Sequence, residues 1–147
     1  HDNHRQTLLL FETGEASRMA IPLSVVARLE EFPRAQIEFS GGQRVVQYRG
    51  HILPLIEVSD HVSGATPARE DQDPMQVVVY SEQGRSVGLV VGRINDIVEE
   101  AINIEGSSQS HGILGSVVIQ QRVTDLLDVP AVIRSANPAF FAGSTQH

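Results

Sequence analysis

The sequence contains no cysteine and no tryptophan, and only 5% of its 147 residues are aromatic. The absence of cysteine excludes disulfides, thiolate metal ligands and a thiol nucleophile, and it is compatible with a cytoplasmic protein. Because aromatic side chains are so few, the core must be built from valine, isoleucine and leucine. For the same reason we do not expect an aromatic groove of the kind that binds proline-rich peptides.

Positive charge is also scarce, and long apolar runs are missing. There are 11 basic against 18 acidic residues, a formal net charge of −7. A nucleic-acid-binding domain needs a basic face, and an anionic membrane surface would repel this chain. No apolar run approaches the roughly 20 residues of a membrane-spanning helix. The length and an apolar content of 41% predict one domain, or two tightly fused subdomains, with a substantial core.

Signatures of catalysis and of metal binding are missing as well. Among the six histidines only His1 and His4 are close in sequence, and no paired ligand motif occurs. The chain has no Gly-x-Ser-x-Gly elbow and no glycine-rich phosphate loop. The acidic pairs Glu30-Glu31 and Glu99-Glu100 fall in strand-like segments, where adjacent side chains point to opposite faces. We therefore predict no catalytic residue, no cofactor and no metal ion, and a binding or scaffold module rather than an enzyme.

What the chain does contain is a series of short apolar runs separated by turn residues, which predicts an all-β fold. Helical turns are expected from Ser24, as a cap, and at 59–62, and a short helix is expected at Pro130. Gly115 is a candidate for a β-bulge, and Gly88 and Gly92 indicate close backbone packing. The predicted strands cover residues 8–11, 18–22, 37–39, 45–48, 52–58, 77–80, 87–91, 113–119 and 123–129.

These predicted strands repeat in the same order. Three segments of the first half resemble three segments of the second, at separations of 68 to 71 residues. Self-similarity at a nearly constant spacing predicts two similar halves. The polar segment 63–74, with one glycine and two prolines, is the predicted linker between them. The matched segments are Leu8–Phe11 with Val77–Tyr80, Ala20–Leu23 with Val87–Val90, and Ile52–Val58 with Val123–Val129.

The stretch from Tyr48 to Val58 organises the first half. Arg49-Gly50 is predicted to be a turn that exposes a cation, followed by a strand that enters the core. Pro54 has no N–H for a sheet ladder, so the strand is predicted to be an edge strand or to bulge there. Arg49 has two possible roles, as an internal brace or as a contact with a partner.

The apolar residues beside this turn, Val46, Ile52 and Leu53, belong either to the core or to an interface. Their strand context favours the core. Together with Arg49 and Gly50 they are the candidate partner-binding residues of the chain.

The combined motifs resemble CheW-like domains, the scaffold module of bacterial chemotaxis. The resemblance covers residues 8–133, with 1–7 as a lead-in, 63–74 as the linker between the repeats and 134–147 as a C-terminal connector. It implies two intertwined five-stranded β-barrel subdomains that share a hydrophobic seam. The motifs that carry it are Ala20-Ile21-Pro22, Tyr48 to Leu55, Val87 to Val91 and the closing run Val123 to Val129.

The resemblance also implies a function. Arg49 and Gly50 match the Arg-Gly motif of the family, at a loop that faces partners. The expected partners are a CheW-type adaptor, the cytoplasmic tips of chemoreceptors and other domains of a parent kinase. The expected location is the cytoplasm, at membrane-associated receptor arrays. No ATP site or phosphorylated histidine is expected in this segment.

Two finer features resemble the C-terminal regulatory domain of a CheA-type histidine kinase. The segment 42–50 is similar to the kinase version, and 136–141 resembles the connector that leads into a receiver domain in hybrid kinases. The alternatives are a free-standing CheW-type adaptor or, from a different class, a small ligand-binding β-barrel or hydrolase. The chain departs from the family pattern at Gly92, usually Asp, and at 101–102, where Lys is frequent, so charge contacts at these positions are in doubt.

Overall fold

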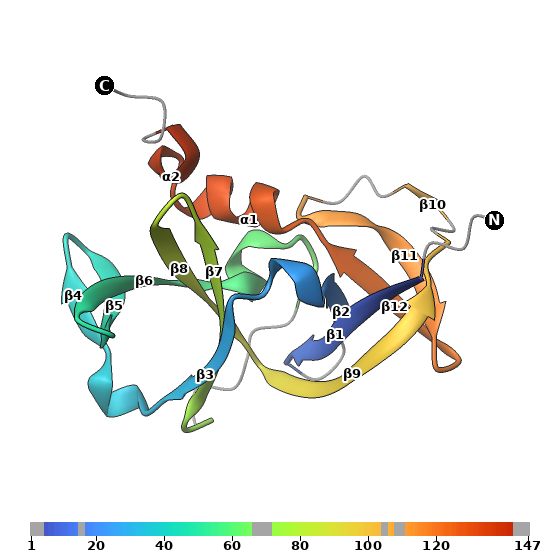
Figure 1. Cartoon of the computed structure of the whole chain (residues 1–147), viewed down its shortest axis with the longest axis horizontal. Coiled ribbons are helices and arrows are strands. Elements are labelled where there is room, and N and C mark those ends of the chain that lie inside the picture. The colour runs from blue at the N-terminus through green and yellow to red at the C-terminus, as the bar shows by residue number, and fades with distance from the viewer. Residues whose placement is uncertain (1–4, 15–16, 66–71, 104–105, 108–110, 143–147) are drawn as a thin grey trace.

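A computed structural model describes residues 5–14, 17–65, 72–103, 106–107 and 111–142, and β-strands dominate it (Figure 1). Three short 3₁₀ helices and two α-helices complete the fold: η1 (Leu23–Val25), η2 (Arg34–Gln36), η3 (Val58–His61), α1 (Val129–Ala136) and α2 (Ala139–Ala142). The strands are β1 (Arg5–Thr13), β2 (Ser17–Pro22), β3 (Arg28–Phe32), β4 (Glu38–Ser40), β5 (Gln43–Tyr48), β6 (His51–Glu57), β7 (Met75–Glu82), β8 (Arg85–Val91), β9 (Arg93–Ala101), β10 (Gly106–Ser107), β11 (Ile113–Ile119) and β12 (Arg122–Leu127).

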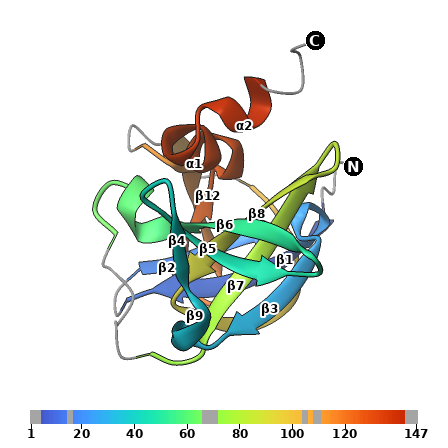
Figure 2. The same ribbon diagram turned by 90° about the vertical axis from the view of Figure 1, so that its left-hand side faces the viewer.

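The strands form two sheets in which the halves of the chain exchange strands. The first sheet has the order β10-β11-β12-β2-β1-β9, and the second has the order β4-β5-β6-β8-β7-β3. The two orders are the same when each strand is exchanged with its counterpart six places along the chain, β1 with β7 and so on to β6 with β12. Each sheet therefore takes two strands from one half and four from the other. Figures 1 and 2 show how strands of the two halves lie side by side. The predicted pair of similar halves is confirmed, and the halves are intertwined.

The mostly β fold of two similar subdomains is confirmed, but two details of the expected barrels are wrong. Each sheet has six strands rather than five, because the short strands β4 and β10 extend one edge. The strand orders are linear, so each sheet has two edge strands and is not a closed barrel.

The central strands are buried on both faces, which explains why they are continuously apolar rather than alternating. In β1, Leu9 and Phe11 face a core shared by both sheets, whereas Leu8 and Leu10 face a core of the first sheet alone. In β7, Val78 faces the shared core, and its neighbours on either side face a core of the second sheet. The shared core is the hydrophobic seam that the resemblance implies.

Parallel pairing joins the halves within each sheet. β12 pairs with β2 through Leu126 and Ala20, and β6 pairs with β8 through Leu55 and Gly88. A Cβ atom on Gly88 would lie 2.8 Å from Val77 Cγ1 and 3.0 Å from Leu55 Cδ2. The close packing predicted at Gly88 is therefore confirmed, and it lies where the two halves meet.

Several local predictions can now be judged. The bulge at Gly115 is confirmed, since the pairing of β11 with β12 shifts register there. The helix at Pro130 is confirmed as α1, whose Asp128 cap accepts a hydrogen bond from the Ala131 N–H at 3.2 Å, and the turn at 59–62 is confirmed as η3. The Ser24 cap is wrong, because η1 follows Pro22 and has no side-chain cap.

The expected edge position of Pro54 is also wrong. β6 lies inside its sheet, between β5 and β8. Pro54 is opposite Val45 of β5, and pairing with β8 begins only at the next residue, Leu55. The missing N–H is thus tolerated because Pro54 precedes the segment that pairs with β8.

The ends of the fold differ from the predicted boundaries. β1 begins at Arg5, inside the predicted lead-in 1–7. The predicted connector 134–147 begins within α1 and includes α2. In the predicted linker 63–74, the described residues 63–65 and 72–74 contain no helix or strand, and 66–71 lie outside the described residues.

Candidate functional site

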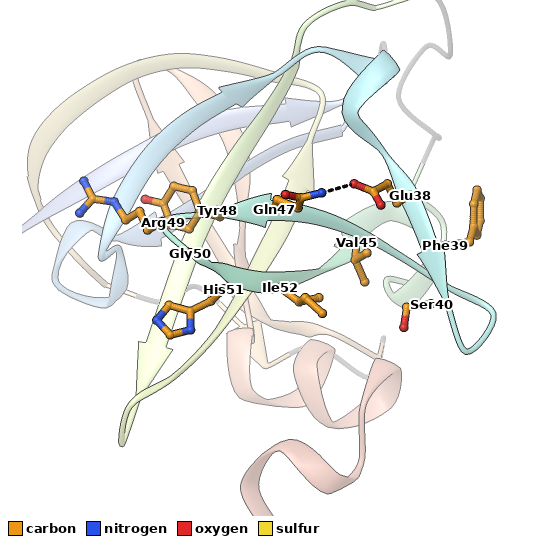
Figure 3. Close-up of a pocket in the computed structure, with 10 residues that line it drawn as sticks. All are labelled: Glu38, Phe39, Ser40, Val45, Gln47, Tyr48, Arg49, Gly50, His51 and Ile52. Atoms are coloured by element: carbon orange, nitrogen blue, oxygen red, sulfur yellow. Dashed lines mark hydrogen bonds between the residues drawn. The ribbon is translucent and has the colours of Figure 1, made fainter.

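The hairpin turn between β5 and β6 forms a projecting corner, which we call the Arg49 corner and define as Tyr48, Arg49, Gly50 and His51. Arg49 has φ 54° and Gly50 has φ 79°, the left-handed pair that closes a two-residue hairpin of type I′. Tyr48 and His51 are paired on either side of the turn. This geometry exposes Arg49 and Gly50 at the tip, as predicted (Figure 3).

The other three candidate residues separate onto two faces of the hairpin. Ile52 is 64% exposed, whereas Val46 and Leu53 are 0% and 2% exposed and belong to the core of the second sheet. The pairing explains this, because Val46 is opposite Leu53 on the inner face and Gln47 is opposite Ile52 on the outer face. Val46 and Leu53 therefore belong to the core in this conformation, whereas Ile52 is open to a partner.

The hairpins of β4, β5 and β6 carry an open hollow of about 600 Å³, which is lined by residues from Glu38 to the Arg49 corner (Figure 3). Phe39 is opposite Arg44, so its ring points away from the face that Gln47 and Ile52 share. Phe39 is 71% exposed, and the Gln47 side-chain amide donates to Glu38 at 2.7 Å. Phe39 was missed by sequence reasoning, although its strand was predicted, because alternation alone does not say which face is outside.

Tyr48 connects the Arg49 corner to the core. Its hydroxyl donates to a carboxylate oxygen of Glu30 at 2.7 Å, and its ring packs edge-on against Phe32 at 5.7 Å. The Arg49 guanidinium lies 5.5 Å from the ring centroid. Burial and the Glu30 carboxylate raise the pKa of Tyr48, and Arg49 opposes this shift. Arg49 is thus exposed on the outside of Tyr48, which argues against the internal-brace role.

The first sheet has an outward face at the equivalent position. Its β11–β12 turn, Gln120-Gln121, has φ values of 56° and 65°, like the Arg49 corner. Val118 and Val123 are directly opposite each other and are 61% and 69% exposed, and Leu114 is also exposed. We call Leu114, Val118 and Val123 the valine face. Sequence reasoning aligned the strands of the two halves but did not identify this second face.

Clusters of metal ligands are not found in the described part of the chain. It contains no group of three or more His, Cys, Asp or Glu residues that could hold a metal ion. His1 and His4, the one close pair in the sequence, lie outside the described residues. Within the described ranges, no helix has the length and apolar character needed to span a membrane.

The second tyrosine, Tyr80, lies where α2 packs on the β7–β8 hairpin. Its ring centroid is 6.2 Å from that of Phe140, and its hydroxyl donates to Glu82 at 2.6 Å. Burial, assisted by the Glu82 carboxylate, raises the pKa of Tyr80 to about 12. The chain has two tyrosines and no tryptophan. The ionisation of Tyr80 can therefore be followed by itself once Tyr48 is replaced.

In a Tyr48→Phe variant, we expect the remaining tyrosine to ionise near pH 12 in the folded protein, and near pH 10 after unfolding in urea. The folded pKa is the higher one, so the unfolded chain loses its proton first. The contribution of Tyr80 to stability is therefore complete below pH 10 and is lost as the pH rises from 10 to 12. Tyrosinate absorbance measures both titrations, and a folded-state midpoint near 10 would contradict the prediction.

The comparisons with known proteins agree with this geometry. A search of curated proteins finds no match. Among solved structures, the scaffolding protein TtCheW from Thermoanaerobacter tengcongensis aligns over 84% of this chain and 88% of its own, with a TM-score of 0.65 and 15% identity. At that identity the likeness shows the fold alone. The family model for the CheW-like domain matches residues 7–137, so the chain belongs to the family of CheW-like domains.

Proposed function

We propose that this chain is a non-catalytic scaffold domain of a chemotaxis-type histidine kinase, which couples the kinase to a CheW-type adaptor and to chemoreceptors. The observation that carries the proposal is the presence of two outward faces at equivalent positions of the two sheets. One combines the Arg49 corner with Ile52, and the other is the valine face. A domain with two separate binding faces can join two partners at once, which is what a scaffold does.

The physical character of the two faces supports protein partners. Exposed apolar side chains that gather on one face are characteristic of interaction sites. Ile52 on one face and Val118 and Val123 on the other are each more than half exposed. The first face carries the cation Arg49 within its turn, whereas the second has two glutamines in its turn and the cation Arg122 directly after it. The two faces therefore place their charged and apolar groups differently, which allows two different partners.

A third apolar feature supports contact with a receptor tip. Leu29 of β3 and Ile97 of β9 are 39% and 48% exposed. Leu29 is opposite Val78, and Ile97 is opposite Leu9. Val78 and Leu9 are both buried in the shared core. Because directly opposite residues share a face of the sheet, Leu29 and Ile97 extend the seam towards the surface. We propose that an apolar segment of a receptor docks on Leu29 and Ile97, where the seam reaches the surface. This contact would form in the cytoplasm, at receptor arrays.

The Arg49 corner gives a direct test of adaptor binding. Calorimetry of the purified chain with a CheW-type adaptor from the same cell should show saturable, micromolar binding. Arg49→Asn should weaken it about fivefold, because a rim guanidinium contributes roughly 1 kcal/mol. Arg49→Ala should weaken it similarly. Asparagine tolerates the positive φ of Arg49 better than alanine, so the melting temperature of Arg49→Asn should not fall.

Gln120→Asn is the matched control, since Gln120 has φ 56° in the equivalent turn of the other sheet. This variant should bind the adaptor with the affinity of the wild type, because its Arg49 corner is unchanged. A large loss of melting temperature in Arg49→Asn would show that Arg49 is a brace. Unchanged affinity in both Arg49 variants would remove the corner from the interface.

The alternative is a free-standing adaptor, and the resemblance of 42–50 and 136–141 to kinase sequences supports the kinase. An immunoblot of the source cells with antiserum against this domain separates the two. A band much larger than 16.0 kDa supports a kinase, and a band near that mass supports an adaptor.

A further inference from the structure

A second cavity, of about 370 Å³, lies between the Arg49 corner, the β7–β8 turn and α2. Figure 1 shows the tip of the β7–β8 hairpin beside α2. The cavity has an apolar floor that includes Ile52 and Phe140, and its cationic and polar groups include Arg49, His51 and Arg85. We call this cavity the α2 cleft.

The charge of the α2 cleft is opposite to that of the molecule. The chain has a formal charge of −7, yet two arginines and a histidine line the cleft, and no Asp or Glu is among its described lining residues. Neither Arg49 nor Arg85 forms an ion pair with a carboxylate in the described part of the chain. Cations beside an apolar floor complement a segment that carries both carboxylates and apolar side chains.

The helix α2 is an ordered wall of the cleft, and tertiary contacts hold it there. Phe140 is 4% exposed and packs against the shared core. The Arg85 guanidinium lies 5.0 Å from the Phe140 ring centroid and donates to the backbone carbonyls of Ala139 and Phe140. A helix of four residues is not stable by itself. The cleft therefore exists only while α2 is docked.

We infer that the α2 cleft binds an acidic, apolar segment of a protein partner, with α2 docked as its third wall. The inference rests on the proposed function, because the cleft shares Arg49 and Ile52 with the proposed adaptor face. It goes further by naming the chemistry of the bound segment and by assigning α2 to the interface. Partner binding then stabilises the docked α2, since the cleft binds only in that state.

The test uses the ¹⁵N-labelled full chain and three synthetic peptides: Glu-Leu-Glu-Leu-Glu, its lysine counterpart and its glutamine counterpart, all with blocked ends. We expect the glutamate peptide to shift the amide signals of Gly50, Ile52, Gly84 and Ser86 saturably, in the millimolar range. The lysine peptide should leave them unchanged, and the glutamine peptide should bind less tightly. Arg49→Gln should weaken the glutamate peptide at least about fivefold, and Phe140→Ala should abolish saturation.

Arg122→Gln is the control for loss of charge, because Arg122 is exposed beside the equivalent turn of the other sheet. It should change the peptide affinity less than about twofold. Failure of the glutamate peptide to shift the cleft signals, or equal shifts by the lysine peptide, would overturn the inference. Adaptor binding without peptide binding would leave the proposed function standing, whereas peptide binding without adaptor binding would support the cleft and contradict that function.

Discussion

Replacing Arg18 with alanine is expected to lower the free energy of unfolding by about 3 kcal/mol, or roughly 6 to 12 °C in melting temperature. Arg18 lies in β2 and is only 9% exposed. Its guanidinium donates to Thr124 Oγ1 at 2.9 Å, to the Ile119 carbonyl at 3.1 Å and to Gln120 Oε1 at 3.0 Å. Without these donors, the Thr124 hydroxyl keeps only its hydrogen bond to the Arg122 carbonyl at 3.3 Å, and the Ile119 carbonyl loses its bond to the guanidinium. Removing one partner of a buried hydrogen bond costs more than the bond itself contributes.

Urea unfolding followed by far-ultraviolet circular dichroism measures this effect, since the chain has no tryptophan for fluorescence. Arg28→Ala is the control, because Arg28 is exposed on the edge strand β3. The double variant Arg18→Leu with Thr124→Val should recover at least about 1 kcal/mol relative to Arg18→Ala, since it removes the donor and a buried hydroxyl together. Equal urea midpoints for Arg18→Ala and Arg28→Ala would contradict a structural role for Arg18.

The comparison of the two halves explains why Arg18 was not predicted. In the matched segments Thr124 occupies the place of Leu53, which is apolar and 2% exposed. Thr124 is fully buried, so its hydroxyl needs a partner, and Arg18 supplies one. The sequence therefore did indicate a buried polar contact, because Thr124 is polar at a position where the other half of the repeat has an apolar residue. The partner could not be named, because it comes from the other half of the chain.

Most of the strands were predictable because strand formation is local, although β9 was not among the predicted strands. A run such as Val77 to Tyr80 is strand-forming wherever it lies, and the echo of Leu8 to Phe11 indicates two similar halves. The exchange of strands was not predictable from spacing, because it depends on pairings such as Leu55 with Gly88 and Leu126 with Ala20. Only the resemblance to the family implied that the halves are intertwined.

The candidate site was predicted in position but not in detail. The Arg49-Gly50 turn follows from local sequence, since a two-residue hairpin requires positive φ at both positions. Which neighbours face outward depends on register, because a shift of one residue reverses every side chain. Ile52 is consequently exposed while Val46 and Leu53 are buried. The valine face and the α2 cleft depend on contacts between distant segments, which no local pattern contains.

Replacing Gly92 with alanine is expected to cost about 3 kcal/mol of unfolding free energy. Gly92 connects β8 of the second sheet to β9 of the first, and its N–H donates to the Glu12 carbonyl at 2.8 Å. An added Cβ would lie 2.6 Å from that carbonyl oxygen, 3.2 Å from Gly14 N and 3.3 Å from Thr13 Cα. All three are backbone atoms, so no side chain can rotate away, and the end of β1 must move. The aspartate usual in the family would meet the same contacts.

Gly41→Ala separates this steric effect from the general cost of replacing glycine. Nothing lies within 4 Å of a Cβ on Gly41, but its φ of +61° makes alanine unfavourable, by about 1 kcal/mol. Gly92→Ala should therefore lower the urea midpoint two to three times as much as Gly41→Ala. Hydrogen exchange should also show faster opening of the β1–β9 ladder, which begins at the pair Glu12 and Arg93. Equal losses of stability in the two variants would mean that β1 moves aside at little cost. The close approach at Gly92 would then not be what holds the two sheets together at this crossing.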